Sequence, residues 1–128
     1  MMTKNAVDKA IELIQILHNP ESGCPVHKSA KPLKILNWTR DELDEIEEEL
    51  IDFSSEDELT GEIGDAIWNL IVLCNELHKN PYDALDMTVE KMKRRHDFLF
   101  DGSPPLSKEE AEKRYQENKR KEKAAKCL

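Results

Sequence analysis

Apolar residues return every three or four positions in several stretches of the chain, separated by short polar or proline-containing breaks. This period is typical of amphipathic helices. No stretch alternates apolar and polar residues in the way that a half-buried strand would. We therefore predict an all-α protein whose main helices cover residues 3–18, 39–53, 55–78 and 82–97.

Local capping signals predict where two of these helices begin. Thr39 with Glu42, and Ser55 with Glu58, have the spacing of capping boxes, in which a hydroxyl and a carboxylate satisfy the first backbone N–H groups. Residues 20–37 contain prolines, a glycine and little periodicity, so we expect a loop there with at most a short helical turn.

The helices are expected to form an antiparallel bundle with short connections, as one domain over residues 1–128 with a four-helix core at about 3–100. On residues 55–78 we expect the buried face to consist of Ile63, Ala66, Ile67, Leu70, Leu73, Cys74 and Leu77. Ser107 with Glu110 predicts a last helix over about 107–125, which is nearly all charged. We expect that helix to pack marginally or against another subunit.

Composition supports a single helical domain in a reducing compartment. The chain has 128 residues, of which 36% are charged and 5% aromatic, with only four glycines. No apolar run is long enough to span a membrane, and the N-terminus does not resemble a signal peptide. Three widely spaced cysteines without a CxxC pair indicate neither a disulfide framework nor a zinc site. We therefore expect a cytoplasmic protein.

Charge is distributed unevenly along the chain. The net charge of −8 argues against nucleic acid as a partner, but residues 41–65 hold thirteen acids and no Lys or Arg. A basic cluster follows, with Lys91, Lys93, Arg94 and Arg95. The two regions could be solvated helix faces, which is the commoner reason for such runs, or two halves of a site for a metal-bound polyanion.

Two acidic pairs stand at helical spacing in the acidic region. Glu42 and Glu45 share one helix face, and Glu62 and Asp65 share another, with Asn69 one turn further on. A short turn makes the two helices antiparallel neighbours, so the four carboxylates would repel one another unless a hard divalent cation joined them. Spacing alone still favours solvated or capping carboxylates over ligands. No Glu-x-x-His pair or EF-hand loop offers another metal motif.

The order of motifs resembles the MazG nucleoside triphosphate pyrophosphohydrolases, an all-α family marked by EExxE followed by ExxD. The matching segments are NPESGCPVHK (19–28), DELDE (41–45), GEIGD (61–65), KMKRRHDFLF (91–100) and YQENKRKEK (115–123). The acidic string 47–49 offers other registers for EExxE. Counting without gaps from Cys24 and Pro25 favours Glu42 and Glu45.

This resemblance implies a reaction and a set of residues that carry it. It implies Mg²⁺, with Mn²⁺ as a substitute, held by Glu42, Glu45, Glu62 and Asp65. Phosphate contacts would come from Lys91, Arg94 and Arg95, and weaker candidates for substrate contacts are Asn69 and Trp38. A nucleoside triphosphate would be hydrolysed to a nucleoside monophosphate and pyrophosphate, with Glu45 as the candidate general base.

The expected role is removal of unwanted nucleotides by a homodimer or homotetramer that binds no nucleic acid or membrane. A relative with one dedicated substrate, such as dCTP, dUTP or phosphoribosyl-ATP, is an alternative, and a non-catalytic helical interaction module is another.

The chain departs from the family pattern at Val26, His27, Ala30, Asp41, Asp97 and Phe98. The first three lie in a segment expected to border the nucleoside, so they bear on substrate preference.

Overall fold

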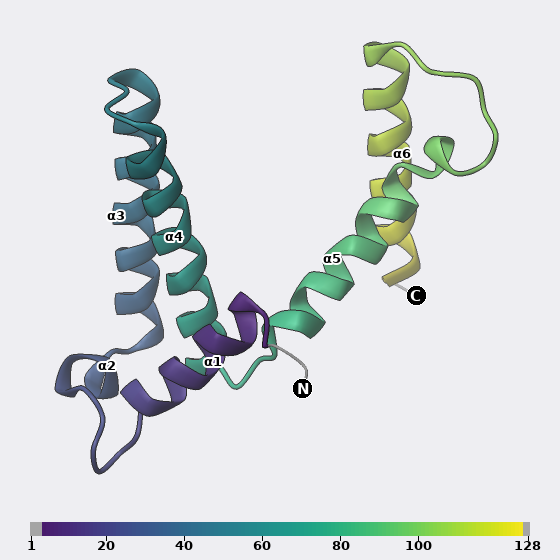
Figure 1. Cartoon of the computed structure of the whole chain (residues 1–128). Helices are drawn as coiled ribbons and strands as arrows, with labels where there is room; N and C mark the ends of the chain where they lie inside the picture. Colours follow the sequence, from purple (N-terminus) through teal and green to yellow (C-terminus); the bar gives the residue numbers. More distant parts are fainter. Residues whose placement is uncertain (1–3, 127–128) are drawn as a thin grey trace. The chain divides into compact units, whose positions relative to one another are not determined.

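The structure is a computed structural model that describes residues 4–126, and within this range it contains helices and no strand. The helices are α1 (Ala6–Leu17), α2 (Pro25–Ser29), α3 (Pro32–Ile51), α4 (Glu56–Glu76), α5 (Pro81–Arg95), the short 3₁₀ helix η1 (Asp97–Leu99) and α6 (Lys108–Lys126) (Figure 1). The predicted all-α class is confirmed. None of the described helices is long and apolar enough to cross a membrane.

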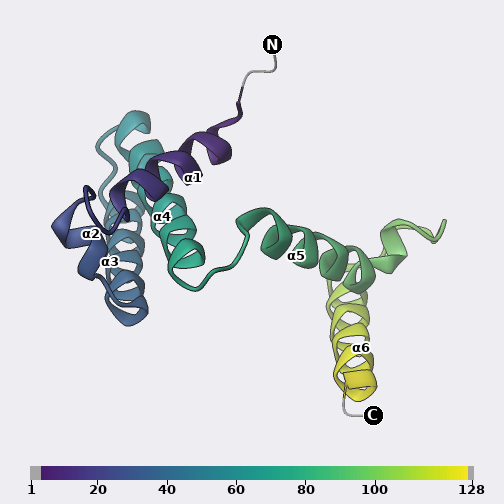
Figure 2. The ribbon, with the colours of Figure 1, turned by 90° about the horizontal axis from the view of Figure 1, so that it is seen from below.

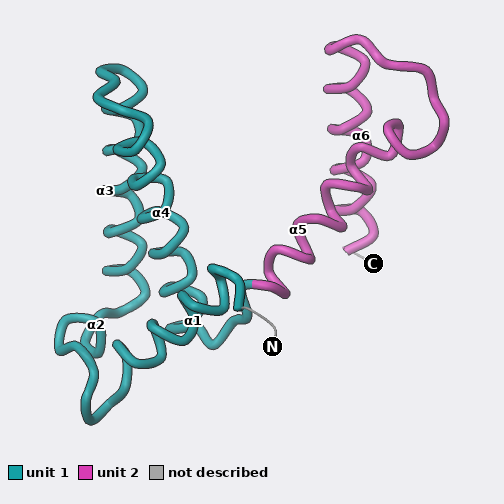
Figure 3. The backbone as a smooth tube through the Cα atoms, viewed as in Figure 1, with its two compact units in different colours: residues 1–81 teal, residues 82–128 magenta. Residues whose placement is uncertain are grey.

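The chain divides into two compact units, residues 1–81 and residues 82–128 (Figure 3). The first unit contains α1 to α4, and the second contains α6, η1 and all of α5 after its first residue. The organisation of the whole chain as one domain stays a prediction.

In the first unit, α3 and α4 lie side by side and antiparallel, and α1 packs against α4 (Figures 1 and 2). The predicted antiparallel pair is therefore confirmed. A small core joins the elements, and its fully buried side chains are Ile14 of α1, Ile35 of α3 and Val72 of α4. Trp38 and Trp68 pack against this core from partly buried positions.

Helix α3 begins at Pro32, seven residues before the predicted start at Thr39. Proline suits the first turn of a helix, because its fixed φ is helical and its missing N–H would have no partner there. Thr39 lies inside the helix, where it is buried and its Oγ1 donates to the carbonyl of Ile35 at 2.9 Å. The predicted capping box at Thr39 is therefore wrong, and the segment expected to be a loop supplies α2 and the first turns of α3.

Ser55 caps α4 as predicted. Its side-chain oxygen accepts a hydrogen bond from the Glu58 N–H at 3.1 Å. The connecting turn is also held from the α3 side, because the buried Glu49 carboxylate accepts from the N–H groups of Ser54 at 2.6 Å and Ser55 at 3.4 Å. Two side chains thus fix the turn that makes α3 and α4 neighbours.

Much of the face that we expected to be buried on α4 is exposed. Ala66 is buried, and Leu73 and Cys74 are partly buried. Ile63, Ile67, Leu70 and Leu77 are 43–52% exposed. The prediction of a buried stripe is wrong for these four residues, because α3 and α1 cover only one side of α4 within the unit.

In the second unit, polar contacts attach α6 to the end of α5. Asn118, which is buried, donates from Nδ2 to the carbonyls of Arg94 and Arg95 at 3.2 Å, and so satisfies groups left open at the end of α5. Ser107 caps α6 as predicted, accepting from the Glu110 N–H at 3.2 Å. These contacts are few and polar, in agreement with the expectation that α6 packs marginally, and packing against another subunit stays a prediction.

Candidate active site

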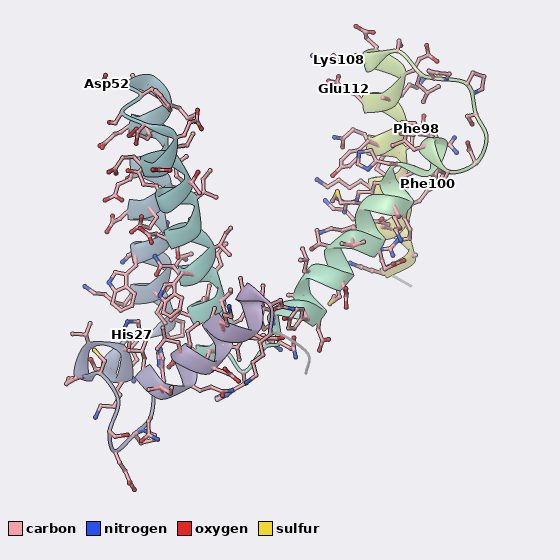
Figure 4. All side chains as sticks on the ribbon, viewed as in Figure 1. His27, Asp52, Phe98, Phe100, Lys108 and Glu112 are labelled. Atoms are coloured by element: carbon pink, nitrogen blue, oxygen red, sulfur yellow. The ribbon has the colours of Figure 1, made fainter. Side chains whose placement is uncertain are left out.

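The four acids singled out from the sequence lie on the α3–α4 pair of the first unit. Glu42 and Glu45 belong to α3, and Glu62 and Asp65 belong to α4. Glu42 and Glu62 are partly buried, whereas Glu45 and Asp65 are exposed. In Figure 4, carboxylate side chains are dense along the half of this pair that leads to the turn labelled at Asp52.

Two of these carboxylates place an oxygen out of contact with solvent and without a protein partner. The atoms are Oε2 of Glu42 and Oε2 of Glu62. Buried polar atoms are normally hydrogen-bonded, and an unpaired carboxylate oxygen is costly. One such oxygen from each helix is therefore available to a ligand that carries positive charge.

Electrostatics show that the two helices bring their acids within range of one another. The pKa of Glu42 is raised to about 7, first by burial, then by a hydrogen bond with Glu45 and by the charges of Glu45, Asp65 and Glu62. Burial also raises the pKa of Glu62, helped by the charge of Glu49 and then of Glu45. The carboxylates of α3 thus act on those of α4, as expected for a shared acidic site.

The donor set suits a hard divalent cation, which prefers carboxylate oxygens. Among the residues that the structure describes, no group of three or more His, Cys, Asp or Glu side chains is already arranged as metal ligands. The acids are close enough to affect one another's pKa, yet they do not converge on one point.

The two weaker candidates for substrate contacts lie beside the acidic pairs. Asn69 is buried on α4, one turn after Asp65. Trp38 is partly buried on α3, one turn before Glu42, and contacts both the core and the ring of His27 at a centroid distance of 5.7 Å. Burial of Asn69 and packing of Trp38 give each residue a structural role as well.

The three basic candidates, Lys91, Arg94 and Arg95, lie on α5 in the second unit. Arg95 is 13% exposed, and it donates from Nε and a terminal nitrogen to Oε2 of Glu122, at 3.1 and 2.9 Å. Its other terminal nitrogen donates to the Tyr115 hydroxyl at 3.1 Å. Arg94 forms an ion pair with Glu122 at 3.4 Å but is 60% exposed, and Lys91 is partly buried. Phosphate binding by these residues stays a prediction.

Sequence reasoning named Glu49 only within the string 47–49 that offers other registers for EExxE, and did not place it with the two acidic pairs. It follows Glu42 and Glu45 at positions i+7 and i+4, so it lies on the same side of α3, and its charge contributes to the raised pKa of Glu62. The helical spacing could have identified it. Its role in holding the turn could not be found that way, because the role depends on where the chain reverses.

Comparison with known proteins identifies the family. The model of the MazG nucleotide pyrophosphohydrolase domain matches residues 30–100, which is more than half of the chain and includes every candidate residue above. The chain belongs to the MazG family. The resemblance inferred from the sequence is therefore confirmed.

Curated relatives and one solved structure agree with membership of the MazG family. The nucleoside triphosphate pyrophosphohydrolases of Escherichia coli K12 and O157:H7 are each 28% identical over 129 aligned residues, covering 96% of this chain. The chain spans about half (48%) of the length of these relatives. The crystal structure of a mazG-related protein from Thermotoga maritima is similar with a TM-score of 0.70 and 25% identity, over 88% of this chain and 98% of that one.

Proposed function

We propose that this MazG domain hydrolyses nucleoside triphosphates, ribose or deoxyribose, to nucleoside monophosphate and pyrophosphate, using Mg²⁺ held between α3 and α4. The observation that carries this proposal is the pair of buried, unpartnered carboxylate oxygens, one on Glu42 and one on Glu62. The names of the Escherichia coli relatives support the substrate class. We propose that the chain acts in the cytoplasm, on unwanted nucleotides.

The proposed ion ligands are Glu42, Glu45, Glu62 and Asp65, and Mn²⁺ could replace Mg²⁺ because both prefer oxygen donors. Bound Mg²⁺ would neutralise phosphate charge and make a coordinated water more acidic. The cation would also relieve the repulsion that raises the pKa of Glu42.

We assign the remaining roles in the reaction from the exposure of each side chain. Glu45 is exposed, so it is our candidate to accept the proton of the attacking water. The water would attack the α-phosphorus, and pyrophosphate would leave. Lys91 and Arg94 are our candidates for contacts with the phosphate chain, because Arg94 is 60% exposed despite its ion pair with Glu122, whereas the fork of Arg95 is occupied by Glu122. Asn69 and Trp38 are the candidates for contacts with the nucleoside.

We also propose that the chain assembles as a homodimer or homotetramer. Ile63, Ile67, Leu70 and Leu77 follow one another at intervals of four, three and seven residues on α4 and its C-cap, and all four are exposed. Leu43 and Leu50 are exposed on α3 at a spacing of seven residues. Exposed stripes of this kind are typical of helix–helix interfaces, and a second copy would cover them.

A turnover panel tests the proposed reaction. The full chain is incubated with a set of ribo- and deoxyribonucleoside triphosphates and Mg²⁺, and pyrophosphate and monophosphate are measured separately. We expect equal amounts of the two products, and loss of turnover in Glu62→Gln and Asp65→Asn. Glu47→Gln, which removes an exposed acid outside the proposed ligand set, is the matched control and should retain activity.

The panel also separates the alternatives. Turnover of several triphosphates supports the proposed role, whereas turnover of one alone indicates a dedicated enzyme. Orthophosphate as the product, or full activity in Glu62→Gln, would contradict the proposed site. No turnover of any nucleotide together with no binding of divalent ions would indicate a non-catalytic module.

A further inference from the structure

A histidine pair joins the elements of the first unit at a place apart from the four acids. His18 directly follows α1 and His27 lies in α2, and the Nε2 atom of His18 is 3.3 Å from the Nδ1 atom of His27. The His18 side chain is only 10% exposed. The His27 ring meets Trp38 of α3 edge-on, and Figure 4 labels His27 on α2.

The geometry of this pair matches two ligands of one metal ion. A tetrahedral ion at about 2.0–2.1 Å from each nitrogen would place the nitrogens about 3.3 Å apart and the ring centroids about 5.2 Å apart. A head-on hydrogen bond of the same length would hold the centroids about 5.6 Å apart. The observed centroid distance is 5.2 Å, with ring planes at 80°. The rings are therefore tilted from a straight hydrogen bond, and their nitrogen and centroid spacings match those of two imidazoles on one tetrahedral ion.

A carboxylate lies near the second nitrogen of the His18 ring. Oε2 of Glu76, the last residue of α4, lies 3.8 Å from Nδ1 of His18. Its charge favours the tautomer with the proton on Nδ1, which leaves a lone pair on Nε2 facing His27. An acid behind the outer nitrogen is the usual arrangement around a metal-bound histidine.

We propose that His18 Nε2 and His27 Nδ1 together bind a borderline divalent transition ion of the Zn²⁺ and Ni²⁺ class, with Glu76 positioning His18. Imidazole prefers such ions, whereas the carboxylates between α3 and α4 prefer Mg²⁺. The site is independent of the proposed hydrolysis, since none of its three residues belongs to the acidic set.

The site supplies two protein ligands, and water completes the coordination. This agrees with the finding that, within residues 4–126, no group of three or more potential ligands is arranged around one point. In the tautomer that Glu76 favours, His27 Nδ1 donates to Nε2 of His18, and on metal binding that proton would move through solvent to Nε2 of His27. Both rings then bind as neutral ligands, and no net proton is released.

Calorimetric titration of the full chain with Zn²⁺, and separately with Ni²⁺, tests the proposal, with excess Mg²⁺ present to occupy the carboxylates. We expect one binding event per chain, weakened about tenfold or more in His27→Gln and in Glu76→Gln. The matched control is His78→Asn, which removes an exposed histidine of the same unit. His78 has a φ of 56°, which Asn tolerates well. Unchanged affinity in His27→Gln, or equal loss in His78→Asn, would overturn the proposal.

A second measurement needs no variant and so does not depend on whether the variants fold. Long-range proton–nitrogen correlation spectra of the wild-type chain resolve the ring nitrogens of each histidine. Zn²⁺ should shift Nε2 of His18 and Nδ1 of His27 together, and EDTA should reverse the shift. Shifts confined to other histidines, or none at all, would contradict the site.

Discussion

The carboxylate of Glu49 accepts a hydrogen bond from the backbone N–H of Ser54 at 2.6 Å, across the turn between α3 and α4. Glu49 shares its side of α3 with Glu42 and Glu45, yet it is used differently. Glu49 closes the turn, whereas Glu45 and Glu42, one and two turns earlier on α3, interact with the acids of α4. Because the turn sets how α3 and α4 pack together, Glu49 helps to position the candidate ligands on these two helices.

Glu49→Ala should destabilise the first unit. The change leaves the N–H groups of Ser54 and Ser55 without their acceptor, which we expect to cost about 1–3 kcal/mol in the free energy of unfolding. Glu48→Ala, at an exposed position, is the control and should cost little. Denaturant unfolding of the two variants measures the difference, and equal stabilities would show that the turn does not depend on Glu49.

Arg95→Lys should loosen α6 from α5, because lysine cannot make the forked contact with Glu122 and also reach Tyr115. Amide hydrogen exchange should become faster around residues 115–122, with a smaller effect in Arg94→Lys, whose side chain is mostly exposed. A rise in KM with unchanged exchange in Arg95→Lys would instead assign Arg95 to phosphate binding.

The pair of Asp97 and Arg114 should make the second unit sensitive to acid. Hydrogen bonds from Arg114 lower the pKa of Asp97 from 3.8 to about 2. A carboxyl group whose pKa is lowered by folding stabilises the fold above its unfolded pKa, and this contribution is lost as pH falls toward the folded value. The stabilisation should therefore be complete at neutral pH and disappear between about pH 4 and pH 2.

Asp97→Asn isolates this contribution. Thermal unfolding should be easier in the variant than in the wild type at pH 6, and the two should converge near pH 2. The comparison is made by far-UV circular dichroism at a series of pH values. A difference that persists unchanged at pH 2 would show that ionisation of Asp97 is not its source.

The exposed stripe of α4 should control assembly. Ile67→Glu puts a charge in the middle of the stripe, so we expect it to dissociate the proposed oligomer. Glu58→Lys, which changes a charge at an exposed position on another side of α4, should leave the assembly intact. Light scattering coupled to size-exclusion chromatography measures both. A wild-type chain that is monomeric at all accessible concentrations would contradict the proposed oligomer.

Local signals predicted most helices, and they failed where burial or long-range contacts decide. Ser55 and Ser107 cap their helices through neighbours three residues away, so the sequence was sufficient for both. Pro32 lies in a segment predicted to be a loop, yet it is the first residue of α3. The polar attachment of α6 through Asn118 joins residues more than twenty positions apart, which no local pattern reveals.

In the candidate site, too, local spacing was predictable and long-range packing was not. Helical spacing correctly placed Glu42 with Glu45 and Glu62 with Asp65, because the period of a helix fixes which residues share a face. The burial of one oxygen on Glu42 and one on Glu62 could not be predicted, since it depends on how two helices pack. The histidine pair was also missed, because a chain reversal after α1 brings His18 and His27 together.

The central claim is that α3 and α4 share a divalent cation, and a Mg²⁺ titration of the melting temperature tests it most directly. An ion that binds only the folded chain should add about 2.7 kcal/mol of stability at a concentration one hundred times its Kd. We predict that the melting temperature of the wild type rises with Mg²⁺ and then saturates, that Glu62→Gln responds much less, and that Glu47→Gln responds like the wild type. Equal responses of the wild type and Glu62→Gln, or no response of the wild type, would contradict the account.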